Sequence, residues 1–255
     1  MARKDLTHVT FIIPVRIDCK ERHENLTLVL NYLQHHFDTN IIVCEESPKP
    51  VLAHLAKRVQ YMHQVSEEKN FHRTRCLNLM IKASKTPVIA NYDADVLMPV
   101  KQYIRGTTVI RNGEIGLILP YSGPVHDVGR AHISKIAETK SVKFLKNEKL
   151  VVLNPRAVGG VLFFRAERYR DIGLENEHFR YWGHEDNERI TRYVKFGFHH
   201  RRTRGPLYHL NHPRGINSHG GHPENKQNEK EFLKVHNMTS DKLKEYVKSW
   251  PWTHD

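Results

Sequence analysis

The chain has 255 residues, of which 39% are hydrophobic and 27% charged, and its formal net charge at pH 7 is +12 with 19 histidines counted as neutral. This composition excludes a disordered chain, a collagen-like repeat and a disulfide framework. No apolar run approaches the roughly 18 residues that a membrane-spanning helix needs. The opening MARKDLTH has no apolar core, so we expect no signal peptide. Three cysteines at no metal-like spacing indicate buried thiols in a reducing compartment.

The positive charge is concentrated in the middle of the chain. Residues 101–170 carry a net +8, whereas residues 171–200 carry −2. Nucleic acid, anionic lipid and phosphorylated small molecules would all be attracted to such a basic surface. Charge alone therefore leaves the partner open, and an ordinary solvated surface remains an equally good explanation.

The first hundred residues alternate between strand and helix patterns. The apolar, β-branched runs 9–15 and 40–44 predict buried strands, with a helix over 26–33 between them. A second helix is predicted at 76–84 and a third strand at 87–95. These are βαβ units, so we expect a parallel sheet with its ligands at the carboxyl ends of the strands.

The second half of the chain has a weaker pattern. We expect, in order, a strand at 116–121, a loop at 123–130, a strand at 158–164 opened by paired glycines, a helix at 185–197 and a loop from 205 to 221. In the predicted helix, Ile190, Tyr193 and Val194 share one face, and Gly197 stands where a helix cap belongs.

The last thirty or so residues predict one or two short, basic amphipathic helices that end in aromatic residues. We divide the chain into a catalytic unit over 1–225, with halves 1–100 and 101–225, and a tail over 226–255. The tail could lie on an anionic membrane surface or pack against the rest of the chain, and both alternatives stay open.

Two aspartates, Asp93 and Asp95, end the strand predicted at 87–95. Carboxylates at this spacing can offer oxygen ligands to Mg²⁺ or Mn²⁺, which keep coordination positions open for a substrate diphosphate. A solvated turn is the simpler explanation of the motif alone. The position at the ligand edge of the sheet favours a metal site.

A second cluster runs from Trp182 to Asp186 and opens the helix predicted at 185–197. Glu185 and Asp186 lie in its first turn, where the helix dipole favours ionised carboxylates, and an ionised carboxylate can act as a general base. Helix capping alone would explain both acids. The indole of Trp182 beside them favours a sugar-binding site.

Two histidines, His209 and His212, form a third cluster. An imidazole here could complete the coordination of a metal held by a carboxylate. The H-x-x-H spacing also occurs in zinc sites, but no cysteine pair or H-E-x-x-H helix accompanies it. A structural zinc site is therefore not expected.

In chain order these motifs resemble the GT-A-fold glycosyltransferases. The likeness is to family 2 bacterial enzymes and to the β-1,4-galactosyltransferase-like group, including chondroitin-polymerase-type domains, over roughly residues 8–215. The resemblance is carried by P-V-R at 14–16, Glu45, F-H-R at 71–73, D-A-D at 93–95, G-G at 159–160, W-G-H-E-D at 182–186 and His209.

The resemblance implies a GT-A fold, which is a Rossmann-like α/β fold with a mostly parallel central sheet flanked by helices. It implies nucleotide contacts from Pro14, Val15, Arg16, Glu45, Phe71, Arg73 and Asp93. It implies sugar contacts from Trp182, Glu185 and Gly160. Asp186 would be the catalytic base, and Asp95 would hold Mn²⁺ or Mg²⁺ together with His209, for which His212 is the competing alignment.

The chain departs from the family pattern at three places. His184 replaces the second glycine before the acids, and Asp18 replaces a second arginine, for which Arg22 is a candidate substitute. The methionine ligand of the galactosyltransferase-like group has no secure counterpart. These changes leave the identity of the donor sugar open.

The function that this resemblance implies is metal-dependent, inverting transfer of a hexose or N-acetylhexosamine, galactose-type favoured, from a UDP-sugar to a saccharide hydroxyl. We expect a role in bacterial surface polysaccharide synthesis, with a lipid-diphosphate-linked acceptor as one option and no nucleic acid partner. The expected location is the cytoplasm, with peripheral attachment to the inner face of the cytoplasmic membrane as an open alternative.

Two other functions stay as alternatives. A sugar nucleotidyltransferase needs a glycine-rich phosphate loop after the first strand, and residues 14–22 contain no glycine. A basic nucleic-acid-binding protein needs aromatic residues among its lysines and arginines, and residues 101–170 are not enriched in them. Both are therefore less favoured than sugar transfer.

Overall fold

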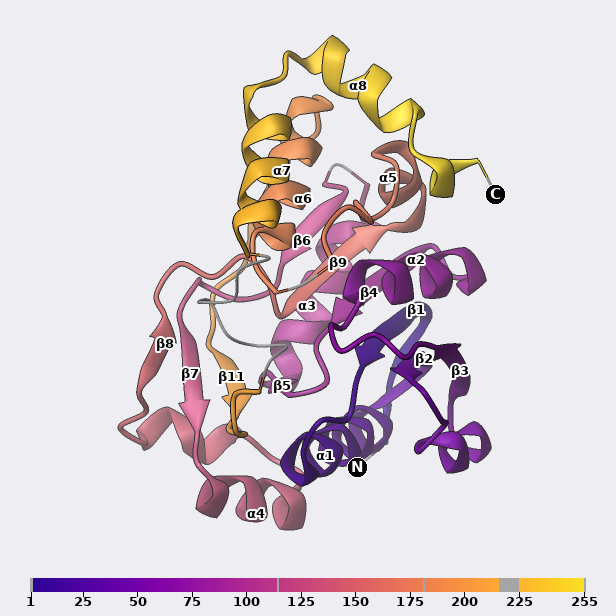
Figure 1. The fold of residues 1–255 in the computed structure, drawn as a ribbon. Coiled ribbons are helices and arrows are strands. Elements are labelled where there is room, and N and C mark those ends of the chain that lie inside the picture. The colour runs from indigo at the N-terminus through magenta and orange to yellow at the C-terminus, as the bar shows by residue number, and fades with distance from the viewer. Residues whose placement is uncertain (1, 114, 181, 216–224, 255) are drawn as a thin grey trace.

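The apolar runs of the first half of the chain become the centre of a seven-stranded sheet (Figure 1). This computed structural model describes residues 2–113, 115–180, 182–215 and 225–254. Across the sheet the strands are β10 (His200–Arg202), β6 (Leu117–Leu119), β9 (Val161–Arg165), β4 (Val88–Tyr92), β1 (Lys4–Val15), β2 (Phe37–Ser47) and β3 (Gln60–Val65).

The sheet is mixed, with a parallel half and one reversed strand. β1 pairs in parallel with β2 and β4, and β2 pairs in parallel with β3. β9 runs antiparallel to both of its neighbours, β4 and β6. The α/β fold class with a mostly parallel sheet is confirmed, and the reversed β9 brings its first residues to the edge where β1 and β4 end.

Helices pack on this sheet as the periodicity predicts. They are α1 (Lys20–His36), α2 (Arg73–Ala83), α3 (Val100–Arg111), α5 (Ala166–Asp171) and α6 (Glu185–Lys195). Leu26, Leu30 and Leu33 of α1 and Leu77 and Ile81 of α2 are buried against the strands. Their burial removes apolar surface from water, and this removal is the main driving force for folding.

A second, four-stranded sheet lies beside the first, in the order β5 (Val96–Leu97), β11 (Leu207–Leu210), β7 (Val125–Val128) and β8 (Val152–Asn154). The chain also forms α4 (Arg130–Thr139), η1 (Ala53–Lys57) and η2 (Lys143–Asn147). The loop predicted at 123–130 was wrong, because it contains β7. The loop predicted at 205–221 was wrong over β11, and its residues 216–221 lie outside the described residues. Neither short segment has a strong strand pattern, and each is held by strands distant in the sequence.

The predicted helix at 185–197 is confirmed as α6, but its buried face differs from the prediction. Val194 is 49% exposed, whereas Arg189 and Arg192 are fully buried. Gly197 follows the helix with a φ of +87°, as a cap glycine should. Of the predicted face, Tyr193 is buried and Ile190 packs against the core. The buried face of α6 therefore combines these residues with ion pairs, which an apolar pattern does not reveal.

The tail forms the two helices that its pattern predicts, α7 (Asn225–Asn237) and α8 (Ser240–Lys248), and ends in the short η4 (Pro251–Thr253). α7 lies alongside α6, and α8 also contacts α6 (Figure 1). Val235, Leu243, Val247 and Trp250 are buried together, with Phe196 packed against them. The division into a unit over 1–225 and a tail over 226–255 stays a prediction.

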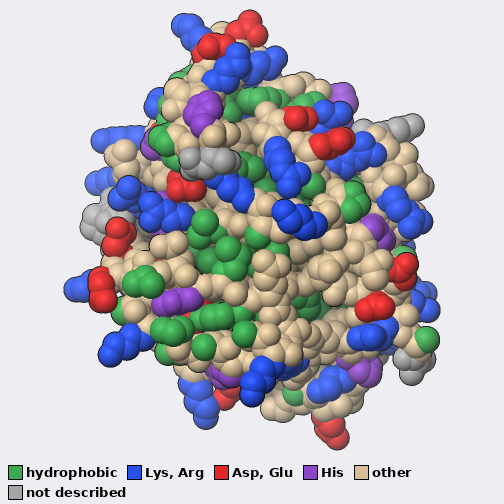
Figure 2. All heavy atoms as spheres, turned by 90° about the vertical axis from the view of Figure 1, so that its right-hand side faces the viewer, with side chains coloured by type: hydrophobic (Ala, Val, Ile, Leu, Met, Phe, Trp, Pro, Cys, Tyr) green, Lys and Arg blue, Asp and Glu red, His purple; other side chains and the backbone are tan. Residues whose placement is uncertain are grey.

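Two surface properties bear on the partners. Among the described helices, none combines the length and the hydropathy needed to cross a membrane. On the face seen in Figure 2, Lys and Arg side chains are scattered among acidic and hydrophobic ones and do not form one continuous stripe.

Candidate metal and sugar-transfer site

The predicted site residues converge on one edge of the large sheet. Asp93 and Asp95 follow the end of β4, and Gly159 and Gly160 precede the start of the antiparallel β9. The backbone N–H of Asp93 donates to the carbonyl oxygen of Gly160 at 2.9 Å, which joins the two turns. Gly160 adopts a φ of +83°, a backbone conformation that glycine takes without strain.

A candidate metal centre is formed by Asp95, His209 and His212. One carboxylate oxygen and one nitrogen from each ring lie within 4.8 Å of one another. His212 Nε2 lies 3.0 Å from Asp95 Oδ2, and His209 Nε2 lies 4.0 Å from the same oxygen. The sequence left the two histidines as alternatives, whereas the structure brings both to Asp95. This group could bind a divalent metal ion.

The partners of the two rings support a metal site. His209 Nδ1 lies 3.4 Å from Asp127 Oδ1, and Asn211 Nδ2 donates to the other oxygen of Asp127 at 2.8 Å. His212 Nδ1 lies 2.8 Å from the carbonyl oxygen of Pro213. When Nδ1 of each ring donates to its oxygen, Nε2 keeps a lone pair for a metal ion, as metal-bound histidines usually require. The residues therefore fit a bound divalent cation.

Asp95 is kept ionised by its surroundings. Burial alone would raise the pKa of its carboxyl, but His212, His209 and Arg22 outweigh burial and hold the pKa far below the usual range. Arg22 Nη1 donates to Asp95 Oδ2 at 3.2 Å, and Arg22 Nε donates to Asp18 at 2.9 Å. The carboxylate is therefore present as a hard anionic ligand at neutral pH.

A second group next to the metal centre is built on Arg73 at the start of α2. Arg73 Nη2 donates to Asp93 Oδ1 at 2.5 Å and to Asn91 Oδ1 at 3.3 Å. Its other terminal nitrogen, Nη1, lies 3.9 Å from Asp186 Oδ1 and is buried without a hydrogen-bond partner in the described part of the chain. A buried guanidinium N–H without a partner is costly, so this donor is available for an anionic or hydroxyl-bearing ligand.

The two acids of α6 have opposite pKa shifts. Burial would raise the pKa of Asp186, but Arg189 and Arg73 outweigh it and hold the pKa below the usual value. For Glu185, burial and the neighbouring charge of Asp186 raise the pKa to about 7. Asp186 is therefore an ionised proton acceptor at neutral pH, while Glu185 holds its proton more readily and accepts a hydrogen bond from the Gly183 N–H at 2.9 Å.

The chain enters α6 through an unusual backbone turn. Gly183 has a φ of +111° and His184 has a φ of +70°, in the region where a second glycine is the natural choice. The His184 ring stacks on Phe232 of α7 with centroids 5.6 Å apart. Trp182, just before the turn, is 44% exposed and presents its indole to solvent, as a sugar-binding ring would.

The predicted nucleotide residues have diverse surroundings. Pro14 and Val15 are buried at the end of β1. Arg16 pairs with Glu46 at 3.1 Å and donates to the backbone carbonyls of Glu68 and Asn70. Phe71 is half-buried and packs against the core.

Glu45 has a full set of partners within the chain. Its carboxylate accepts hydrogen bonds from the backbone N–H groups of Val51 and Leu52 at 3.0 and 2.9 Å, from Ser47 Oγ at 2.7 Å and from the Tyr61 hydroxyl at 2.6 Å. These hydrogen bonds hold the segment that follows β2 in place. Its contact with a nucleobase stays a prediction.

Two residues of the site were not predicted, Arg189 and Asp127. Arg189 donates to Asp186 at 2.5 Å, and the three-residue spacing on one helix was the signal that could have indicated it. Asp127 lies in β7 and reaches His209 through a strand pairing that no local pattern reveals.

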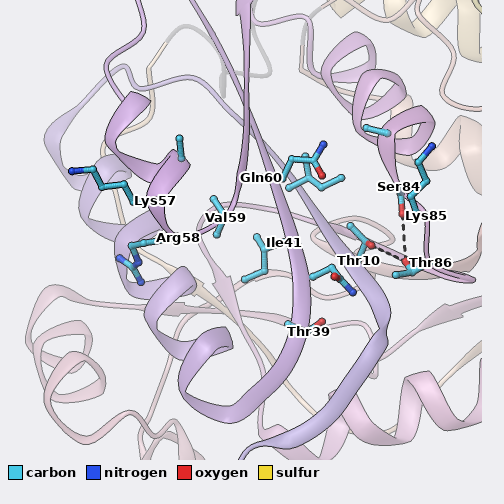
Figure 3. Close-up of a pocket in the computed structure, with 14 residues that line it drawn as sticks. Thr10, Thr39, Ile41, Lys57, Arg58, Val59, Gln60, Ser84, Lys85 and Thr86 are labelled. Carbon is cyan, nitrogen blue, oxygen red and sulfur yellow. Dashed lines mark hydrogen bonds between the residues drawn. The ribbon is translucent and has the colours of Figure 1, made fainter.

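A cavity of about 460 Å³ lies elsewhere, at the opposite edge of the sheet (Figure 3). It is lined by the beginnings of β2 and β3, by the end of η1 and by the turn after α2. Its hydroxyl groups pair with one another, since Thr10 lies 2.7 Å and Ser84 3.4 Å from Thr86 Oγ1. None of the predicted site residues lines it.

Comparison with known family models gives one match. A family model described as the N-terminal domain of galactosyltransferase matches residues 142–214, a segment that holds Trp182, Asp186, His209 and His212. A search of curated protein sequences gives no significant match.

Solved structures give a wider likeness. The catalytic domain of Drosophila β1,4-galactosyltransferase 7 in complex with xylobiose is similar with a TM-score of 0.58 and 14% identity, over 93% of this chain and 83% of that one. A mutant of the same enzyme in complex with manganese, UDP-Gal and xylobiose gives a TM-score of 0.56. A Pyrobaculum calidifontis mannosyltransferase in complex with GDP-Man and Mn²⁺ gives 0.52 and 15% identity, over 82% of this chain and 58% of that one.

These identities are low, so the likeness concerns the fold. The mixed α/β sheet is the part of this chain that the likeness describes. The family-model match covers the second half of the site. The chain therefore has the GT-A fold of glycosyltransferases, and its residues 142–214 are similar to the N-terminal domain of galactosyltransferase.

Proposed function

We propose that this protein is a metal-dependent, inverting glycosyltransferase that moves a galactose-type hexose or N-acetylhexosamine from a UDP-sugar to a hydroxyl of a saccharide. One observation carries the proposal. The candidate metal group around Asp95 lies two residues along the chain from Asp93, which Arg73 joins to the ionised Asp186. A cation site and a proton acceptor side by side are what sugar transfer from a nucleotide diphosphate needs.

Each residue then has a task. A divalent ion bound by Asp95, His209 and His212 would supply Lewis-acid stabilisation of the negative charge on the departing diphosphate. Nη1 of Arg73, which has no hydrogen-bond partner among the described residues, would donate to the diphosphate or the sugar of the donor. Asp186 accepts the proton of the acceptor hydroxyl while that oxygen bonds to the anomeric carbon and the bond from this carbon to the UDP oxygen breaks. Attack from the face opposite to UDP inverts the configuration at the anomeric carbon.

The acceptor class is proposed from one structural neighbour. The Drosophila enzyme is in complex with xylobiose, a saccharide, and this favours a saccharide acceptor here. A role in bacterial surface polysaccharide synthesis, a lipid-diphosphate-linked acceptor and peripheral membrane attachment stay predictions. The tail residues considered for membrane contact include Trp250, which is buried, so the packing alternative for that side chain is the better supported one.

The proposal is tested with Asp186→Asn and Asp95→Ala. With UDP-galactose and an oligosaccharide acceptor, we expect either change to lower the rate of UDP release by about 10²–10⁴-fold, the usual effect of removing a general base. Asp95→Ala should also weaken the binding of the metal ion. Asp171→Asn, a change at a half-exposed carboxylate on α5, is the control and should keep its activity. Near-normal transfer by Asp186→Asn with saturating Mn²⁺ would refute the assignment.

The donor is identified by a screen of UDP-galactose, UDP-N-acetylgalactosamine, UDP-glucose and UDP-N-acetylglucosamine, each with Mn²⁺, with Mg²⁺ and with a chelator. We expect transfer with at least one donor and its loss with the chelator. Analysis of the product by NMR would show a β-linkage from an α-linked donor. An α-linked product would contradict the inverting mechanism.

A further inference from the structure

The carboxylate of Asp186 belongs to a closed ring of polar side chains. Asn91 Nδ2 lies 3.0 Å from the Tyr169 hydroxyl, and that hydroxyl donates to Glu175. Glu175 binds Arg189, and Arg189 donates to Asp186. Arg73 then closes the ring between Asp186 and Asn91.

Within this ring, Arg189 contacts both acids directly. Its Nε and Nη2 donate to the two oxygens of Glu175 at 2.6 and 2.7 Å, and its Nη1 donates to Asp186 Oδ1 at 2.5 Å. The side chains of Arg189 and Glu175 are 0% and 1% exposed. A planar guanidinium held by two bonds to one carboxylate has its third donor aimed in a fixed direction.

We propose that Arg189, held by Glu175, is a positioning residue that fixes the Asp186 carboxylate where it meets the acceptor hydroxyl. The inference rests on the proposed role of Asp186 as the proton acceptor. Glu175 neutralises the charge of Arg189, so that burying the guanidinium costs less than burying it alone. The pair thereby places a positive charge beside Asp186 without leaving a net charge in the core.

The next turn of the same helix provides a comparison. Arg192 is equally buried and binds Glu188 at 2.7 Å, but its remaining donors go to the backbone carbonyls of Ile172 and Leu174. Arg192 thus serves the packing of α6 and has no contact with Asp186 among the hydrogen bonds of the described residues. The two arginine–glutamate pairs differ in the group that accepts from Nη1, which is Asp186 for Arg189 and two backbone carbonyl oxygens for Arg192.

The test compares two double variants, Arg189→Met with Glu175→Gln, and Arg192→Met with Glu188→Gln. Each removes both members of its ion pair, so neither leaves an unpaired buried charge. For the first, with UDP-galactose, Mn²⁺ and an oligosaccharide acceptor, we expect kcat to fall about 10–100-fold, in the range of a misplaced catalytic group, with the KM for UDP-galactose unchanged. For the second, we expect both constants to stay near the wild-type values.

The pH profile of kcat gives a readout that a purely structural role would not change. Five groups face Asp186, namely Arg73 from α2, Asp93 after β4, Tyr121 after β6, and Glu185 and Arg189 from α6. Arg189 lowers the pKa of Asp186, so its removal should move the acid limb of the profile upward by about one pH unit. Arg189→Lys, which keeps the positive charge but not the forked geometry, should restore the position of the limb and only part of kcat.

The outcomes separate the two proposals. If Asp186→Asn keeps its activity, the proposed function fails and the inference fails with it. If Asp186→Asn is inactive and the Arg189 and Glu175 double variant, folded by circular dichroism, keeps kcat and the acid limb of the wild type, only the inference fails. If Arg189→Lys lowers kcat and its acid limb lies at the same pH as the acid limb of the double variant, the positioning role is overturned as well. A lowered kcat, an unchanged KM and a displaced limb together support it.

Discussion

At the residue scale, the position of Asp186 is set by contact as well as by charge. Gly159 passes so close that a Cβ built on it would lie 1.9 Å from Asp186 Oδ2. The carboxylate cannot simply turn aside, because Arg189 holds its other oxygen at 2.5 Å. The absence of a side chain at residue 159 is therefore part of the site.

We predict that Gly159→Ala abolishes most of the transfer activity while the protein stays folded. The methyl group would displace the proton acceptor by an ångström or more, and a displacement of this size costs about 10²-fold in rate. The measurement is kcat/KM with UDP-galactose and Mn²⁺, together with thermal unfolding. Gly129→Ala is the matched control, since no atom lies within 4 Å of its Cβ. Equal activities of the two variants would contradict the prediction.

Residues of the site were predicted from the sequence where the motif is local. Asp93 and Asp95 end a clear apolar strand, and ligands gather at strand ends. His209 and His212 lie three residues apart in a predicted loop, and the family resemblance was what joined His209 to Asp95. Arg189 was missed because an arginine near the start of a helix ordinarily points to solvent. Its burial depends on Glu175, which lies fourteen residues earlier, and no pattern records that contact.

At the scale of elements, the apolar runs were sufficient for the large sheet but not for the small one. β1, β2 and β4 contain apolar runs with β-branched residues, and their predicted centres are confirmed. β7 and β11 have four residues each, and they exist because each pairs with the other across some eighty residues of chain. Short strands of this kind are stabilised by their partners and not by their own propensity.

The tail helices show the same dependence on distant contacts. Trp250, two residues after the end of α8, is 1% exposed. The guanidinium carbon of Arg192 lies over its indole, 5.0 Å from the ring centre. We predict that Trp250→Ala lowers the free energy of unfolding by about 3–5 kcal/mol, the usual cost of removing a buried aromatic ring. Urea denaturation would measure it. Trp182→Ala is the control at an exposed indole and should change the free energy by less than about 1 kcal/mol. A loss of less than about 1 kcal/mol for Trp250→Ala would contradict the prediction.

At the scale of the whole molecule, the structure relates the basic middle segment to the site. Asp127 of β7 holds His209, and α4 begins directly after β7. The first residue of α4, Arg130, donates to Asn25 at 3.3 Å, and Asn25 donates in turn to the carbonyl oxygen of Leu210 at 2.8 Å. The lysines of α4 and η2 therefore lie on elements that are held next to the metal group. The acids at the start of α6 lie in the segment of net charge −2.

We predict that the lysines in and beside α4 and η2 attract an anionic acceptor. They are Lys135, Lys140, Lys143 and Lys146. Changing all four to Gln should raise the KM for an acceptor that bears carboxylate or phosphate groups by about tenfold at low salt, because attraction between exposed charges is long-ranged there and is screened as salt is added. UDP affinity, measured by calorimetry with Mn²⁺, and the KM for a neutral acceptor of the same length should not change.

The control for this prediction removes the same charge from another part of the surface. Lys57 and Lys85 lie at the cavity on the opposite edge of the sheet, and Lys242 and Lys244 are exposed on α8. All four can be changed to Gln together. Because exposed charges are screened beyond about 10 Å, the Debye length at 0.1 M salt, this control variant should keep the acceptor KM of the wild type. If both variants raise this KM equally, only net charge matters and α4 has no special role. If the α4 and η2 variant loses UDP affinity, those lysines serve the donor instead.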